Sequence, residues 1–145
     1  MTLKVLCPMG TNIFLNKWVV CKVLYYQDEH QVINELDLVH DNYKTFVKES
    51  RIQTIYKCTN VDDVFLTLKA RSFEIKVKPD AVKSILPISV FSWGDIVQES
   101  ERPEIQGEID NIIWHDKDQE YKYFIKVEGK LKTRRYSFTE LKLIK

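Results

Sequence analysis

The stretch that decides the fold runs from residue 107 to residue 127 and reads GEIDNIIWHDKDQEYKYFIKV. From Tyr121 to Val127, apolar or aromatic side chains occupy every second position, which is the period of a strand that buries one face. Gly107–Trp114 predicts a second strand, and its alternation slips near Asn111, where we expect a β-bulge. The polar residues His115–Gln119 predict the turn between the two strands.

Three further strands are expected on either side of this stretch. One follows the turn signal Gly94-Asp95, and a hairpin turn at Glu128-Gly129-Lys130 leads to another strand over Leu131–Tyr136. Ser137–Glu140 has the length of one 3₁₀ turn, and Leu141–Ile144 predicts a short closing strand. Four side chains are expected to face the interior: Ile109, Ile125, Val127 and Leu141.

This order of five short strands, with a 3₁₀ turn before the last, resembles the SH3-like barrels, to which Tudor and KOW-containing domains are related in shape. The following residues carry the resemblance: Gly94-Asp95-x-Val97, Gly107-x-Ile109, Trp114, the Tyr121–Val127 strand, and Tyr136 followed by Glu140-Leu141. The resemblance implies a small closed antiparallel barrel over roughly residues 90–145. It implies no particular function, because this fold supports many unrelated binding roles.

The first 88 residues predict a second β-rich region with short helical segments. Its expected strands are Leu3–Cys7, Ile13–Tyr26, Asp63–Ala70 and Ser72–Lys78, whereas Arg51–Cys58 shows only Ile52 and Tyr56 among polar residues. Ile13–Tyr26 is apolar on both faces and is expected to be central. Gln31–Val39 fits either a strand or a short helix, Arg71-Ser72 fits either a hairpin or a bend within one strand, and Pro79–Val82 is expected to open one helical turn.

Pro87 marks the expected domain boundary. We therefore predict a mainly β chain (β-rich α+β), in which an N-terminal β-rich domain over residues 1–88 packs on a C-terminal five-stranded SH3-like barrel over residues 89–145.

The composition is typical of a soluble globular protein. Hydrophobic residues make up 44% and charged residues 30% of the 145 residues, while glycine and proline occur four times each, which excludes a disordered chain. The run Trp18–Tyr26 is too short to span a bilayer, and no signal peptide is evident. The odd number and wide spacing of Cys7, Cys21 and Cys58 predict free thiols. We therefore expect a cytoplasmic protein that does not contact a membrane.

No motif predicts catalysis, a metal or a cofactor. His30, His40 and His115 show no metal-ligand spacing, and no Cys-x-x-Cys pair is present. The four glycines do not cluster into a phosphate-binding loop, and the acidic pairs Asp28-Glu29 and Asp62-Asp63 are typical of solvated turns. The sequence therefore predicts a protein that is not an enzyme.

Charge is unevenly distributed over the C-terminal third of the chain. Residues 92–115 hold six acidic residues and one basic residue, whereas residues 116–145 hold nine basic and five acidic residues. The two segments either steer a charged partner or neutralise each other within one fold. The candidate contact residues are, in the acidic stretch, Glu99, Glu101, Glu104, Glu108 and Asp110, and, in the basic stretch, Lys130, Lys132, Arg134 and Arg135.

The basic stretch allows three interpretations. It is an edge strand that its charges keep from aggregating, a contact for an acidic protein, or a phosphate-binding strand with Tyr121, Tyr123 and Tyr136 available to stack on bases. Trp93 and Trp114 either line a peptide or methyl-ammonium groove or pack in the core.

The order Gly-x-Ile, Trp-His, Tyr-x-Tyr, Arg-Tyr, Glu-Leu over the last 55 residues is similar to that of uncharacterised bacterial proteins, some of which resemble immunity proteins of polymorphic toxins. This resemblance implies a non-catalytic protein-binding module that neutralises a cognate toxin domain by binding it. The alternative is a nucleic-acid-binding protein that uses the basic strand, although a net charge of +1 is low for that class.

Overall fold

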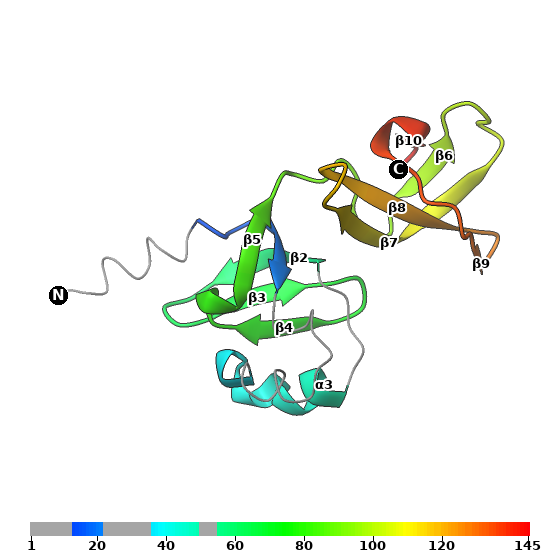
Figure 1. Cartoon of the computed structure of the whole chain (residues 1–145). Coiled ribbons are helices and arrows are strands. Elements are labelled where there is room, and N and C mark those ends of the chain that lie inside the picture. The colour runs from blue at the N-terminus through cyan, green and yellow to red at the C-terminus, as the bar shows by residue number, and fades with distance from the viewer. Residues whose placement is uncertain (1–12, 22–35, 50–54) are drawn as a thin grey trace. The chain divides into compact units, whose positions relative to one another are not determined.

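The computed structural model describes residues 13–21, 36–49 and 55–145. The chain divides into two compact units, residues 1–88 and residues 89–145, and each is described by itself. Each unit holds one five-stranded antiparallel sheet (Figure 1). The expectation of a mainly β fold is therefore confirmed.

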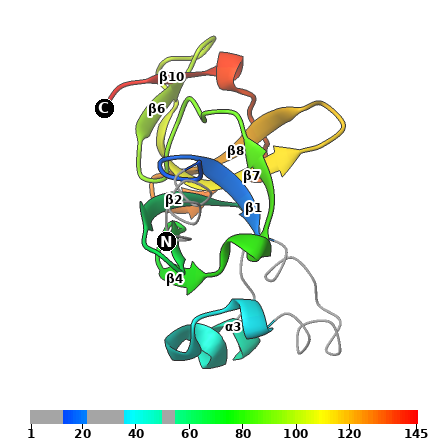
Figure 2. The same cartoon turned by 90° about the vertical axis from the view of Figure 1, so that its left-hand side faces the viewer.

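The sheet of the N-terminal unit has the strand order β4-β3-β2-β1-β5. Its strands are β1 (Trp18–Cys21), β2 (Ile55–Val61), β3 (Leu66–Lys69), β4 (Glu74–Val77) and β5 (Val82–Leu86). Among the residues that the structure describes, its helical segments are short: η2 (Leu36–Leu38), η3 (Asp41–Tyr43), α3 (Lys44–Glu49) and η4 (Pro79–Ala81). The first three lie beside β4 in both side views (Figures 1 and 2).

Two backbone hydrogen bonds hold the segment between η2 and η3 against the edge of β4. His40 N donates to Lys76 O at 2.9 Å, and Lys78 N donates to Leu38 O at 2.7 Å. Val39 lies between them, forms an isolated bridge with Val77 and is buried. This pairing covers the edge strand, which would otherwise expose unpaired backbone groups.

The predictions for this unit were right in part. The helical turn at Pro79 is present, and β3 and β4 form a hairpin that Ala70 N closes by donating to Phe73 O at 2.8 Å. The strand expected over Ile13–Tyr26 is wrong for residues 13–16, which form a turn with Asn16 at φ 65°. β1 covers residues 18–21 of this range and pairs with both β2 and β5, whereas residues 22–26 lie outside the described residues. The described end of Gln31–Val39 is a 3₁₀ turn followed by a bridge, and the strand expected over Leu3–Cys7 lies outside the described residues.

The hydrophobic core of the N-terminal unit lies between the sheet and the segments beside it. Its buried members are Val19, Cys21, Val39, Tyr56, Cys58, Leu66, Leu68, Ala70, Ile75, Val77 and Ala81. Cys21 and Cys58 are free thiols, as expected, whereas Cys7 lies outside the described residues. Burial raises the pKa of Cys58 to about 11, so this thiol stays protonated and unreactive at neutral pH.

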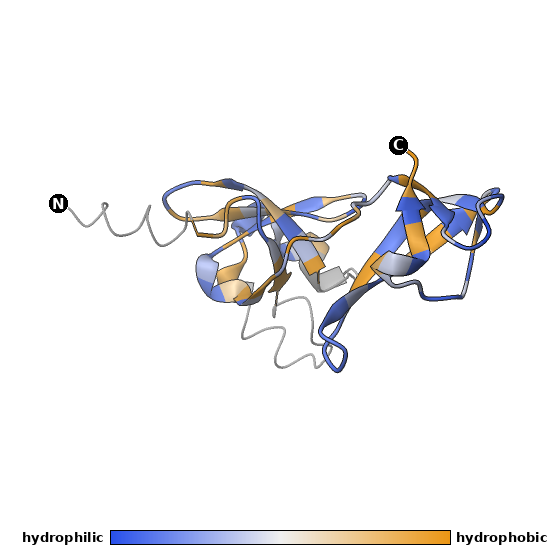
Figure 3. Cartoon of the chain, turned by 90° about the horizontal axis from the view of Figure 1, so that it is seen from above, coloured by the Kyte–Doolittle hydropathy of each residue, from blue (hydrophilic) through white to orange (hydrophobic). Residues whose placement is uncertain are grey.

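The sheet of the C-terminal unit has the strand order β10-β6-β7-β8-β9. Its elements are β6 (Ile96–Glu99), β7 (Gln106–His115), β8 (Glu120–Val127), β9 (Lys130–Leu131), the 3₁₀ helix η5 (Phe138–Glu140) and β10 (Leu141–Leu143). The bulge expected near Asn111 interrupts the register between Ile109 and Asn111. Hydrophobic and hydrophilic positions lie side by side on these strands, as one buried face requires (Figure 3).

Three of the four residues expected to face inward are buried, namely Ile109, Ile125 and Leu141, whereas Val127 is only half-buried near the end of β8. The fourth strand, expected over Leu131–Tyr136, is wrong in length. β9 ends at Leu131, and only Tyr136 returns to pair with Tyr123. The residues between them are all exposed, because this charged run has no apolar face to bury.

Replacing Ile125 with Ala is expected to lower the free energy of unfolding by about 2–5 kcal/mol, because Ile125 is fully buried in β8 and its loss leaves a cavity. Urea denaturation followed by tryptophan fluorescence measures this change. The matched control is Val127→Ala on the same strand, with an expected loss of about 1 kcal/mol or less because that side chain is half-buried. Equal losses in the two variants would contradict the assigned core.

Candidate functional site

Glu99, at the end of β6, lies at the centre of a polar network rather than on an acidic contact face. Its side chain is only 6% exposed. One carboxylate oxygen accepts a hydrogen bond from Arg102 Nε at 2.9 Å. The other accepts a short hydrogen bond from the Tyr136 hydroxyl and lies 3.8 Å from a guanidinium nitrogen of Arg134. The expectation that Glu99 contacts a partner is therefore corrected, because its carboxylate is occupied within the chain.

The network continues from Arg134 into η5. The Arg134 guanidinium donates to Glu140 at 2.9 Å and lies over the Tyr136 ring, 4.4 Å from its centroid. Glu140 also accepts the backbone N–H of Ser137 at 2.8 Å, which completes a capping box at the start of η5. An open hollow of about 330 Å³ lies beside this network, between the β6–β7 loop and η5. Its lining charges are largely neutralised by one another.

The network shifts the acid–base behaviour of its members. The Tyr136 hydrogen bond and the two arginines hold the pKa of Glu99 below its usual value, although burial acts in the opposite direction. The backbone N–H of Ser137, together with Arg134, lowers the pKa of Glu140. Burial and the bond to Glu99 raise the pKa of Tyr136 to about 12. The network is therefore built for two ionised carboxylates and a neutral tyrosine.

These shifts predict that the C-terminal unit loses stability in acid. A carboxyl group whose pKa is lower in the folded chain stabilises the fold above its unfolded pKa, and that contribution disappears as the pH falls through the folded value. The relevant range lies below about pH 4.5, the ordinary pKa of a glutamate. Urea denaturation between pH 7 and pH 3 should therefore show a falling free energy of unfolding. In Glu99→Gln the fall should be smaller, and an unchanged slope in that variant would contradict the assignment.

The other acidic candidates do not form one free face either. Glu101 and Glu104 are exposed in the β6–β7 loop, whereas Glu108 and Asp110 are half-buried on β7. Asp110 lies 3.4 Å from the ammonium nitrogen of Lys126 on β8. Together with the Arg134–Glu99 and Arg134–Glu140 pairs, this contact supports the second interpretation of the charge pattern, mutual neutralisation of neighbouring segments.

The basic segment, defined as residues 130–135, differs from the acidic stretch because every residue in it is exposed. Arg134 is held by Glu99 and Glu140. Within the part of the chain that the structure describes, Lys130, Lys132 and Arg135 have no carboxylate within the 4.0 Å of an ion pair. Leu131, between the two lysines, is 54% exposed. This segment therefore presents three available cations around one apolar side chain.

The aromatic candidates mostly pack inside the C-terminal unit. Tyr121, Tyr123 and Tyr136 are buried. Trp114 is half-buried, packs edge-on against Tyr121 with ring centroids 5.0 Å apart, and donates its indole N–H to Asp116 at 3.0 Å. Trp93 is half-buried in the turn before β6. Neither tryptophan lines the hollow beside η5, so the core-packing interpretation fits Trp114 best.

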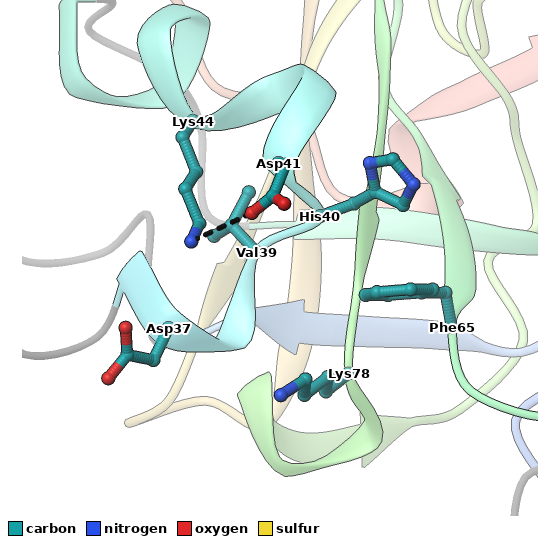
Figure 4. Close-up of a pocket in the computed structure, with 7 residues that line it drawn as sticks. All are labelled: Asp37, Val39, His40, Asp41, Lys44, Phe65 and Lys78. Atoms are coloured by element: carbon teal, nitrogen blue, oxygen red, sulfur yellow. Dashed lines mark ion pairs between the residues drawn. The ribbon is translucent and has the colours of Figure 1, made fainter.

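A second hollow, of about 520 Å³, lies in the N-terminal unit and was not predicted from the sequence. Its lining residues are Asp37, Val39, His40, Asp41, Lys44, Phe65 and Lys78 (Figure 4). They come from three separate segments that the backbone pairing of residues 38–40 with β4 brings together. Sequence spacing carries no signal for this grouping, because the contacts are non-local.

Among residues 13–21, 36–49 and 55–145, no group of three His, Cys, Asp or Glu side chains is placed to hold a metal ion. No helix in the same residues is long and apolar enough to cross a membrane. A family model described as a family of unknown function, DUF6960, matches residues 22–142. The chain belongs to this family. The match covers most of both units, so membership concerns the two-unit chain and not the C-terminal sheet alone. No curated protein and no solved structure matches the chain.

Proposed function

We propose that the protein is a non-catalytic binding protein whose basic segment contacts an acidic surface of another protein. The observation that carries this proposal is the exposure of Lys130, Lys132 and Arg135, three cations with no ion-pair partner in the described residues, around the exposed Leu131. Charge complementarity steers such a surface to its partner and sets the association rate. A desolvated apolar or arginine side chain then slows dissociation.

A protein partner is favoured over nucleic acid by the positions of the tyrosines. Binding of single-stranded nucleic acid without sequence preference combines basic side chains with aromatic rings on which bases stack. Tyr121, Tyr123 and Tyr136 are buried and are not available for stacking. The exposed aliphatic side chain of Leu131 suits a protein surface better than a phosphate backbone.

The more specific form of the proposal is an immunity-type protein that neutralises a toxin domain by covering its functional surface. A rigid scaffold suits this role, because a preformed surface loses little conformational entropy on binding. The Glu99 network supplies such rigidity by joining β6 to the basic segment and η5. The buried free thiols Cys21 and Cys58 fit the reducing cytoplasm in which such a protein would protect its own cell.

A pull-down from the native source with the full chain tests the proposal. Parallel samples are treated with nuclease or left untreated, and bound protein and nucleic acid are both identified. The proposal expects one acidic protein, recovered equally in both samples and removed by 0.5 M salt. Recovery of nucleic acid, with all bound proteins lost after nuclease treatment, would favour the alternative function.

A further inference from the structure

We propose that the hollow of the N-terminal unit binds a small organic anion that carries a planar apolar group. This site is separate from the basic segment and does not depend on the proposed protein contact. Its volume of about 520 Å³ lies in the range of small-molecule sites, which are concave and combine apolar walls with a few polar groups.

Nitrogen donors border the hollow on several sides. Lys44 Nζ lies 3.0 Å from Asp41, and it keeps further N–H groups for a second acceptor. Within the described residues, Lys78 Nζ has no carboxylate within the 4.0 Å of an ion pair. Figure 4 shows the ammonium group of Lys44 across the hollow from Phe65, and Lys78 below the Phe65 ring. An anion held by both lysines would accept charge-assisted hydrogen bonds from each of them.

His40 borders the hollow, and its ring has a defined orientation. Its Nδ1 accepts the backbone N–H of Asn42 at 3.0 Å, so the neutral ring carries its proton on Nε2. The imidazole also packs against Phe65 and Tyr43, with ring centroids 4.8 Å and 5.7 Å apart. The ring is therefore fixed by contacts on both sides.

Phe65 provides the apolar wall, and local hydrogen bonds fix its position. Asp62 accepts the backbone N–H groups of Val64 and Phe65 at 2.8 Å and 2.7 Å, and Asp62 N donates to Phe65 O at 3.0 Å. The half-buried ring of Phe65 faces the hollow together with the buried Val39. A planar ligand group would pack on these two side chains while its anionic group reaches the lysines.

The lining holds two carboxylates and two ammonium groups, so its net charge is zero and the positions of these charges decide which ligand fits. Asp41 is paired with Lys44, and Figure 4 shows the carboxylate of Asp37 on the side of the hollow remote from Phe65 and His40. Two lining charges, Asp37 and Lys78, have no ion pair among the described residues, and of these two Figure 4 shows Lys78 on the side of Phe65. One monovalent anion would neutralise the ammonium group of Lys78.

Titration of the full chain with phenyl phosphate and benzoate tests the proposal, with inorganic phosphate and benzyl alcohol as controls. Binding is followed by the NMR signals of the His40 ring protons. We expect dissociation constants on the order of 1 mM for the two aromatic anions. Inorganic phosphate lacks the aromatic ring and benzyl alcohol lacks the negative charge, so each should bind at least about tenfold more weakly.

Variants separate this site from a general effect of positive charge. Lys78→Gln should weaken binding of both aromatic anions about tenfold, and Phe65→Leu should weaken phenyl phosphate more than inorganic phosphate. The matched control is Lys69→Gln, an exposed lysine on β3 that does not line the hollow, and it should change nothing. Circular dichroism confirms folding of each variant. No shift of the His40 signals with either aromatic anion, or equal losses in Lys78→Gln and Lys69→Gln, would overturn the proposal.

Discussion

Replacing Glu99 with Ala is expected to lower the free energy of unfolding of the C-terminal unit by about 3–5 kcal/mol. The carboxylate is buried and binds the side chains of Arg102, Tyr136 and Arg134. Its removal leaves the buried Tyr136 hydroxyl without its acceptor and two arginines without their common anion, and breaking a buried charged pair in this way has costs of that size. Urea denaturation followed by tryptophan fluorescence measures the change.

Two matched variants show whether the network causes this loss. Glu99→Gln keeps a hydrogen-bond acceptor without the charge and should lose less than Glu99→Ala. Glu101→Ala removes an exposed carboxylate two residues away and should stay within about 0.5 kcal/mol of the wild type. A loss below about 1 kcal/mol in Glu99→Ala would mean that the network does not hold the C-terminal unit together.

Reversing the charges of Lys130, Lys132 and Arg135 to Glu is expected to weaken binding of an acidic protein partner about 100-fold at low salt. Each reversal removes one attraction and adds one repulsion, worth about 1 kcal/mol per site at an exposed position, and three sites together give that factor. Most of the change should lie in the association rate and should shrink as salt is added. Surface plasmon resonance at 50 mM and 500 mM salt measures both rates.

The C-terminal strands were predictable because local patterns specify them. Tyr123 and Ile125 alternate with half-buried residues on β8 as the sequence indicates. Gly94 and Gly129 occupy turns with φ of 88° and 79°, a conformation that glycine adopts without strain. Gly107 is required for a different reason. A Cβ at this position would lie 2.7 Å from the carbonyl oxygen of Lys126 on the neighbouring strand, so only glycine fits there without a clash.

The fourth strand and the role of Glu99 were not predictable in the same way. Residues 131–136 carry β-compatible side chains at both ends, but Tyr136 is held by Glu99, which lies 37 positions away in the chain. No local pattern marks such a long-range pair. A charged residue in an acidic stretch is most simply interpreted as exposed, and only the fold shows that Glu99 faces inward.

The hollow of the N-terminal unit also depends on contacts between segments that are far apart in the sequence. Lys78 comes close to His40 and Lys44 because Lys78 N donates to Leu38 O across the edge of β4. The sequence of residues 31–39 fits both a strand and a helix, so this pairing could not be derived from periodicity. Contacts between segments distant in sequence, rather than local propensity, create the site.

The most direct test of the proposed function is the dissociation constant of the captured partner for three forms of the full chain. These are the wild type, the variant with Lys130, Lys132 and Arg135 reversed to Glu, and a control with the same change in net charge at the exposed Lys69, Lys83 and Lys117. We predict weakening of about 100-fold at 50 mM salt for the first variant and less than about threefold for the control. Equal affinities for both variants would contradict a role for the basic segment in binding.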